Sequence, residues 1–124
     1  MNREESAKLP SMMEENLKKA LTELLVLSLL SQKEYYIGEL TATLNEKSRG
    51  ALTIVFPYAA IYRLQQSEYI TESKKRNAPD GRRRQYYTIT QKGSAYLQQL
   101  LDTYKRFSKG VAAVLERGED SDES

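Results

Sequence analysis

The sequence contains no cysteine, no histidine and no tryptophan in its 124 residues. The absence of cysteine and histidine excludes disulfide bonds, cysteine–histidine zinc sites, thiol nucleophiles and serine–histidine–aspartate triads. No acidic cluster has the spacing of a metal site, and no nucleophile, base and oxyanion donor can be assembled into a catalytic site. We therefore expect a protein that is not an enzyme and that binds no metal and no cofactor.

Long hydrophobic runs are also missing. No stretch of about 18 apolar residues occurs, and the first residues lack the apolar core of a signal peptide. These absences predict a cytoplasmic protein of the bacterial type. A length of 124 residues is enough for one domain.

Charge is distributed unevenly along the chain. There are 19 Lys and Arg residues against 17 Asp and Glu residues, which gives a net charge of +2. Residues 116–124 hold five acids and one Arg, a charge of −4, so the rest of the chain carries +6, the difference between +2 and −4. A basic domain with an acidic end favours a polyanionic partner.

Residues 56–93 contain the most informative pattern. Near their start, Ala60, Ile61 and Leu64 recur on one face of a 3.6-residue period, which predicts a short helix with that face inward. The residues that follow this helix predict two strands joined by a turn. A helix followed by a β-hairpin is the second half of a winged helix-turn-helix.

The predicted hairpin is strongly basic. Residues 69–73 and 85–89 have the composition of strands, and the Asn-Ala-Pro-Asp-Gly sequence at 77–81 is typical of a turn. Between the strands only Asp80 opposes six cations, which are Lys74, Lys75, Arg76, Arg82, Arg83 and Arg84. Such a hairpin repels itself unless it meets a polyanion.

Upstream, the sequence predicts a long first helix. Ser11 and Glu14 have the spacing of a capping box, so we expect residues 1–10 to be mobile and the helix to run to about Gln32. Residues 24–30 are apolar nearly all round. Because a small domain can rarely surround such a helix, we infer that part of this surface meets a second subunit.

A second helix and a short strand are expected before the recognition helix. Residues 37–45 form a helical pattern with Ile37, Leu40 and Leu44 inward. Residues 52–55 favour a short strand that pairs with the hairpin. The resulting fold class is mainly α (α+β), and the winged helix-turn-helix domain spans residues 11–89.

The last predicted helix covers residues 90–117, with Thr90 as its N-cap, and an acidic tail follows at 118–124. Its apolar residues recur in steps of three and four, as in a coiled-coil seam, although this seam can also pack wholly on its own domain. We expect a dimer interface made of Leu24, Leu97, Leu100, Leu101, Tyr104, Phe107, Val111 and Val114.

Two stretches resemble the PadR family of bacterial transcriptional regulators. The family's recognition helix carries Tyr-Pro-x-Leu-x-Arg-Leu, and residues 58–64 here read Tyr-Ala-Ala-Ile-Tyr-Arg-Leu. Its wing closes with Arg-x-Tyr-Tyr-x-Leu-Thr-x-x-Gly, and residues 84–93 match with Ile for Leu. Ala59 stands where the family has Pro, and a proline occurs two places earlier, at Pro57. The resemblance covers about residues 20–115 and is to the compact subgroup with a short last helix.

Together, the pattern and the resemblance imply an interface for double-stranded DNA. Tyr58 and Tyr62 lie one turn apart on the recognition helix, and the pattern leaves open whether one of them packs in the core. Arg63 can face the DNA or pair with Glu39 or Glu68 on the surface, and the cations can simply belong to a soluble loop. The expected DNA-binding residues are Thr53, Tyr58, Tyr62, Arg63, Lys74, Lys75, Arg76, Arg82, Arg83 and Arg84.

The resemblance implies a repressor that binds a near-palindromic operator as a homodimer and is released by a small hydrophobic effector. We expect that effector between the subunits, near Leu17, Tyr104 and Phe107. Some compact members bind flat compounds with a tryptophan in the dimer helix, which this chain does not have. The alternative function is a winged-helix module that binds other proteins, for which the exposed face of the recognition helix should be apolar.

Overall fold

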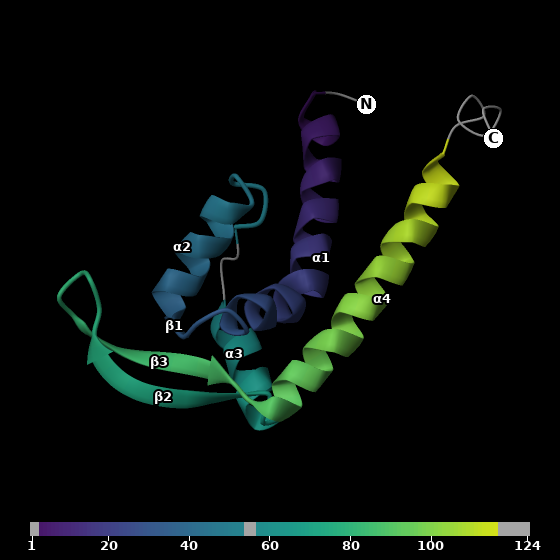
Figure 1. The fold of residues 1–124 in the computed structure, drawn as a ribbon. Coiled ribbons are helices and arrows are strands. Elements are labelled where there is room, and N and C mark those ends of the chain that lie inside the picture. The colour runs from purple at the N-terminus through teal and green to yellow at the C-terminus, as the bar shows by residue number, and fades with distance from the viewer. Residues whose placement is uncertain (1–2, 54–56, 117–124) are drawn as a thin grey trace.

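The computed structural model describes residues 3–53 and 57–116, and the side chains from residue 12 onward, apart from Pro57. It is a mainly helical α+β fold with a three-stranded antiparallel sheet and a long C-terminal helix, as the sequence predicted (Figure 1). No helix in these described ranges is long and apolar enough to cross a membrane. The elements are α1 (Arg3–Leu30), β1 (Tyr35–Tyr36), α2 (Ile37–Lys47), α3 (Pro57–Gln66), β2 (Ile70–Asn77), β3 (Arg83–Ile89) and α4 (Gln91–Leu115).

Helix α1 differs from its prediction at both its start and its centre. It begins at Arg3, so Ser11 lies inside the helix and is not its N-cap. Between Leu24 and Leu30, the side chains of Leu24, Val26, Leu27, Leu29 and Leu30 are all buried within this one chain. One chain therefore buries most of this stretch by itself, which removes the reason for expecting a second subunit there, and Leu24 offers no free surface to a dimer interface.

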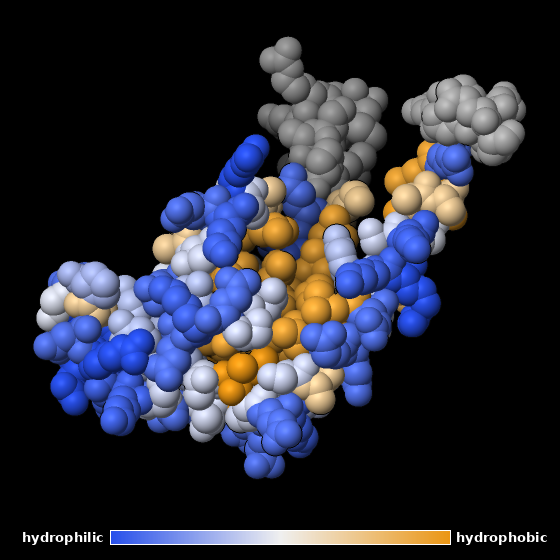
Figure 2. Space-filling view, viewed as in Figure 1, coloured by the Kyte–Doolittle hydropathy of each residue, from blue (hydrophilic) through white to orange (hydrophobic). Residues whose placement is uncertain are grey.

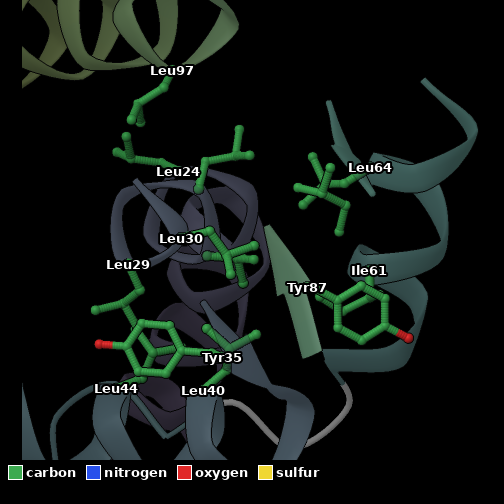
Figure 3. Close-up of a cluster of buried hydrophobic side chains, with 13 residues drawn as sticks. Leu24, Leu29, Leu30, Tyr35, Leu40, Leu44, Ile61, Leu64, Tyr87 and Leu97 are labelled. Atoms are coloured by element: carbon green, nitrogen blue, oxygen red, sulfur yellow. The ribbon is translucent and has the colours of Figure 1, made fainter. Parts of the chain in front are cut away.

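The core shows how so small a domain surrounds α1. Around α1, Leu40 and Leu44 approach from α2, Ile61 and Leu64 from α3, and other residues from the sheet and α4 (Figure 3). Leu27, Leu40 and Leu64 are among the most deeply buried side chains. The inward faces predicted for α2 and α3 are thus confirmed for their leucines and for Ile61.

The sheet has the strand order β1-β3-β2. Strand β1 pairs with β3 through Tyr35 opposite Tyr87 and Tyr36 opposite Tyr86. The hairpin strands β2 and β3 pair from Ile70 to Asn77, with an irregularity between Glu72 and Lys75. The third strand predicted at residues 52–55 is wrong, because β1 fills that role and Leu52 lies in a turn; residues 54 and 55 are outside the described part.

Tyr86 and Tyr87 lie on opposite faces of β3, yet both are buried. Tyr87 belongs to the core and lies beside Ile61 in Figure 3. The guanidinium of Arg76 covers the ring of Tyr86 and lies 3.7 Å from the ring centroid. The rings of Tyr86 and Tyr36 form a T-shaped pair with their centroids 5.5 Å apart. The guanidinium of Arg76 therefore buries the tyrosine that lies on the outer face of β3.

Helix α4 begins as predicted. The hydroxyl of Thr90 accepts a hydrogen bond from the backbone N–H of Gly93 at 3.0 Å, which confirms Thr90 as the N-cap. Leu97 is buried in this chain's own core, so it does not belong to a dimer interface, and Leu100 and Leu101 pack partly against that core. From Tyr104 onward the apolar side chains are exposed, and α4 ends at Leu115.

Candidate DNA interface

Helix α3 presents two tyrosines to solvent. Its inner face, with Ala60, Ile61 and Leu64, is buried, whereas Tyr58 is 67% exposed and Tyr62 is 63% exposed. The sequence left open whether one of these rings packs in the core, and the structure places both outside it. A pair of exposed phenols on a short helix can donate hydrogen bonds to phosphates or base edges.

Gln66 belongs to the same exposed face and was missed in the sequence. It follows Tyr62 by four residues, as Tyr62 follows Tyr58, and such a spacing puts all three on one side of a helix. The spacing of four residues between these positions is the sequence signal that could have identified Gln66. A glutamine can contact adenine through two hydrogen bonds, so it is a natural groove-facing residue.

Arg63 is held by a residue that the sequence did not suggest. Its Nε donates to Oε2 of Glu23 on α1 at 3.1 Å, with the Arg63 side chain 56% exposed. The alternatives Glu39 and Glu68 are not its partners, and Glu39 lies 3.7 Å from Lys33 instead. Arg63 therefore lies on the flank of α3 that faces α1.

Thr53 has its hydroxyl engaged in the loop before α3. Its Oγ1 donates to Oδ1 of Asn45, near the end of α2, at 2.7 Å. This bond fastens the loop to α2. A contact between Thr53 and DNA would have to use its remaining acceptor capacity.

Two of the six predicted wing cations are neutralised within the chain. Arg76 pairs with Glu34 at 2.8 Å, and Arg84 pairs with Asp80 at 2.7 Å. The pKa of the Asp80 carboxyl lies below its usual value. The larger cause is its hydrogen bond from the Arg84 side chain, and the smaller is its hydrogen bond from the backbone N–H of Arg82. The charges of these two arginines are therefore offset by acids of the same chain.

The other four wing cations are exposed, and within the described ranges none of them forms an ion pair. Two are on β2, one is in the turn and one begins β3. The turn also contains Gly81, whose φ of +84° is a conformation that favours glycine. The four cations are Lys74, Lys75, Arg82 and Arg83. This part of the wing carries the uncompensated positive charge.

The wing and α3 adjoin each other. A surface hollow is lined by Tyr58 of α3, by Arg84 and Gln85 of β3, and by Ile37 and Gly38 at the start of α2. In Figure 1 the wing extends away from the body of the molecule, on the side opposite α4. Tyr58 of α3 and Arg84 of the wing therefore belong to neighbouring surfaces, so one extended polyanion can contact both elements.

Other proteins are similar to this chain in structure or in sequence. A PadR-like transcriptional regulator from Bacillus cereus is 28% identical, with 82% of this chain and 98% of that one covered and a TM-score of 0.70. A Streptococcus transcriptional regulator is 30% identical, with coverages of 81% and 97% and a TM-score of 0.70. An uncharacterized protein of Lysinibacillus sphaericus is 28% identical over 94 residues, which are 74% of this chain and 85% of that protein.

The family model agrees with these likenesses. Residues 26–99 match the model of the transcriptional regulator PadR-like family. That range contains α2, α3, the whole sheet and the first turns of α4, and therefore the whole candidate interface. The family consists of transcriptional regulators, not enzymes, and its members bind DNA. The chain belongs to the PadR-like family of transcriptional regulators.

Proposed function

We propose that the protein is a repressor that binds a near-palindromic operator as a homodimer. In this arrangement two α3 helices enter successive major grooves, about 34 Å apart, and two wings contact the flanking backbone. The observation that carries the proposal is the exposed face of α3 beside four wing cations that pair with no acid among the described residues. The face carries hydrogen-bonding groups on Tyr58, Tyr62 and Gln66, whereas the alternative of a protein-binding module calls for an apolar face.

The two elements divide the work of recognition. Lys74, Lys75, Arg82 and Arg83 are long and exposed, which suits contacts to phosphates, and such contacts carry no direct sequence information. Tyr58 and Tyr62 stand on the helix that enters the groove, which suits contacts to base edges and nearby backbone. Thr53 and Arg63 complete the proposed site, each through atoms that its intramolecular hydrogen bond leaves free.

A comparison of Arg83→Ala with Tyr62→Ala tests this division. Arg83→Ala should weaken operator and random DNA alike and lower the salt slope by about one per subunit. Tyr62→Ala should cost about 1–3 kcal/mol on the operator and much less on random DNA. The measurement is binding to an operator selected from a random pool, and to a random duplex, over a salt series. The assignment would be reversed if Arg83→Ala alone removed the operator preference.

Arg76→Ala is a matched control for Arg83→Ala. It removes the same charge from the same hairpin, but from a residue that Glu34 already opposes at 2.8 Å. We expect a smaller change in salt slope than for Arg83→Ala. A slope change as large as that of Arg83→Ala would show that ion pairing within the chain does not decide which wing cations contact phosphate.

The dimer is proposed from apolar surface that one chain leaves uncovered. Tyr104, Phe107, Val111 and Val114 of α4 are between 47% and 83% exposed, and Leu17 of α1 is 47% exposed. Figure 2 shows hydrophobic residues gathered between α1 and α4, and again near the end of α4. Such a surface is larger than scattered single residues would give and is typical of an association site.

An effector site between the subunits is a further part of the proposal. Leu17, Tyr104 and Phe107 offer apolar surface with one phenol, which is what sites for small hydrophobic compounds need. Titration with planar aromatic dyes should give binding that Phe107→Ala weakens. Tyr62→Ala, which removes an equally exposed ring from α3, should leave dye binding unchanged. Equal loss in both variants would point to nonspecific adsorption instead of this site.

A further inference from the structure

Glu23 joins three helices through one carboxylate. Its Oε2 accepts a hydrogen bond from Nε of Arg63 on α3 at 3.1 Å, and its Oε1 accepts one from the hydroxyl of Tyr96 on α4 at 3.2 Å. Glu23 lies in the second half of α1, and its side chain is 28% exposed. With both oxygens used, the position of the carboxylate is defined from two sides.

The bond at Nε leaves most of the Arg63 guanidinium free. A guanidinium has five N–H donors in a planar fork, and Nε supplies only one of them. The Arg63 side chain is 56% exposed and its Glu23 partner is 28% exposed, so the fork remains open to solvent at the edge of α3. A long side chain that is already held loses less rotamer freedom when it binds a partner.

Tyr96 gives the carboxylate its second support. Its ring stacks on the ring of Tyr69 with centroids 4.2 Å apart and planes 11° apart. Burial, followed by the nearby charge of Glu23, raises the pKa of the Tyr96 phenol, so the hydroxyl stays protonated and remains a donor. Tyr96 stands on α4, the helix whose other half carries the exposed apolar surface described above.

We propose that Glu23 is a positioning residue for DNA recognition, which orients Arg63 toward the operator while Tyr96 sets the place of Glu23. The inference rests on the proposed operator function. It also links the reading helix to the helix proposed for dimerisation, because a shift of α4 against α1 would move the carboxylate that holds Arg63. An ordinary surface ion pair contributes little to stability by itself. It would neither orient Arg63 nor link the two helices.

A double-mutant cycle between Glu23 and Arg63 tests the proposal. Glu23→Ala should lower the ratio of operator to random affinity about tenfold, the lower end of what residues that orient metal ligands contribute at metal sites. The affinity for random DNA should stay the same or increase, because one negative charge near the phosphates is removed. In the Arg63→Ala background, Glu23→Ala should have no further effect on the ratio.

Three further variants separate this role from a structural one. Glu23→Gln keeps the shape of the side chain and one acceptor oxygen but replaces the other oxygen with an NH2 donor, so it should retain part of the ratio and keeps the test valid if Glu23→Ala folds poorly. Tyr96→Phe removes only the bond from α4 and should lower the ratio less than Glu23→Ala. Glu15→Ala removes another acid of α1, one that lies 3.8 Å from Lys18, and should leave the ratio unchanged.

The outcomes are distinct. If Glu23→Ala weakens operator and random DNA equally, or acts as strongly without Arg63 as with it, Glu23 is a structural tie and the proposal is overturned. If the wild type binds operator and random DNA equally, the operator function itself fails, and the role of Glu23 fails with it. Thermal unfolding of each variant, followed by circular dichroism, shows whether a change in DNA binding comes from lost structure.

Discussion

The two ends of α4 meet different surroundings. At its first turn the helix touches the rest of the domain through backbone atoms, since the N–H of Thr90 donates to the carbonyl of Tyr69 at 3.0 Å. At its last turns Val111, Val114 and Leu115 are all more than half exposed. One continuous helix therefore closes the fold at one end and presents apolar surface at the other. The two ends should respond to substitution in opposite ways.

Two glycines on α4 give the largest contrast. A Cβ on Gly93 would lie 2.0 Å from the carbonyl oxygen of Tyr69, whereas a Cβ on Gly110 would meet nothing within 4 Å. Gly93→Ala should therefore lower the free energy of unfolding by about 3 kcal/mol or more, because backbone must move to admit the methyl group. Gly110→Ala should raise it by about 0.5–1 kcal/mol, the difference in helix propensity. Chemical denaturation measures both.

Equal effects of the two substitutions would contradict the contrast. A loss for Gly110→Ala would mean that its helix face is already covered by a close partner in solution. A mild effect of Gly93→Ala would mean that α4 can move away from Tyr69 at little cost. Either result would weaken the distinction between a closed and an open end.

The cap at Thr90 gives a smaller effect at the closed end. Its hydroxyl accepts from the N–H of Gly93 at 3.0 Å and donates to the carbonyl of Glu68 at 2.7 Å. Thr90→Ala removes both bonds and should cost about 1 kcal/mol of stability. Thr90→Ser keeps the hydroxyl and should recover most of the loss. If serine were as destabilising as alanine, the methyl group of Thr90 and not its hydrogen bonds would be responsible.

Local signals in the sequence located much of this fold. The apolar periods of α2 and α3 predicted Leu40, Leu44, Ile61 and Leu64 as inward residues, and the spacing of Thr90 before the last apolar seam predicted its cap. Each of these signals lies within a few residues of the feature that it specifies. For that reason they could be read without knowledge of the tertiary structure.

The missed features depend on contacts between distant residues. Arg63 and Glu23 are 40 positions apart, and Arg76 and Glu34 are 42 positions apart, so no periodicity connects them. The sequence predicts the third strand at residues 52–55, whereas Tyr35 and Tyr36 supply it from much earlier in the chain. The same limit applies to α1, whose burial depends on every other element of the core.

The open end of α4 gives the smallest expected effect on the folding of a single chain. Val111 is 55% exposed, so Val111→Glu should change the free energy of unfolding of one protomer by no more than about 0.5 kcal/mol. In a dimer that buries this surface, the same substitution would place an unpaired charge in an apolar interface, which is strongly unfavourable. Sedimentation should therefore show a monomer, and circular dichroism should show that its helicity is unchanged.

Ala113→Glu is the matched control, because it adds the same charge to the opposite side of the same exposed helix, two residues away. It should leave the dimer intact, since a charge on the outward side remains in water. If both variants dimerise like the wild type, this end of α4 is not the interface. If Ala113→Glu dissociates the dimer and Val111→Glu does not, the helix pairs through its other face, and the exposed apolar residues of α4 would need another partner.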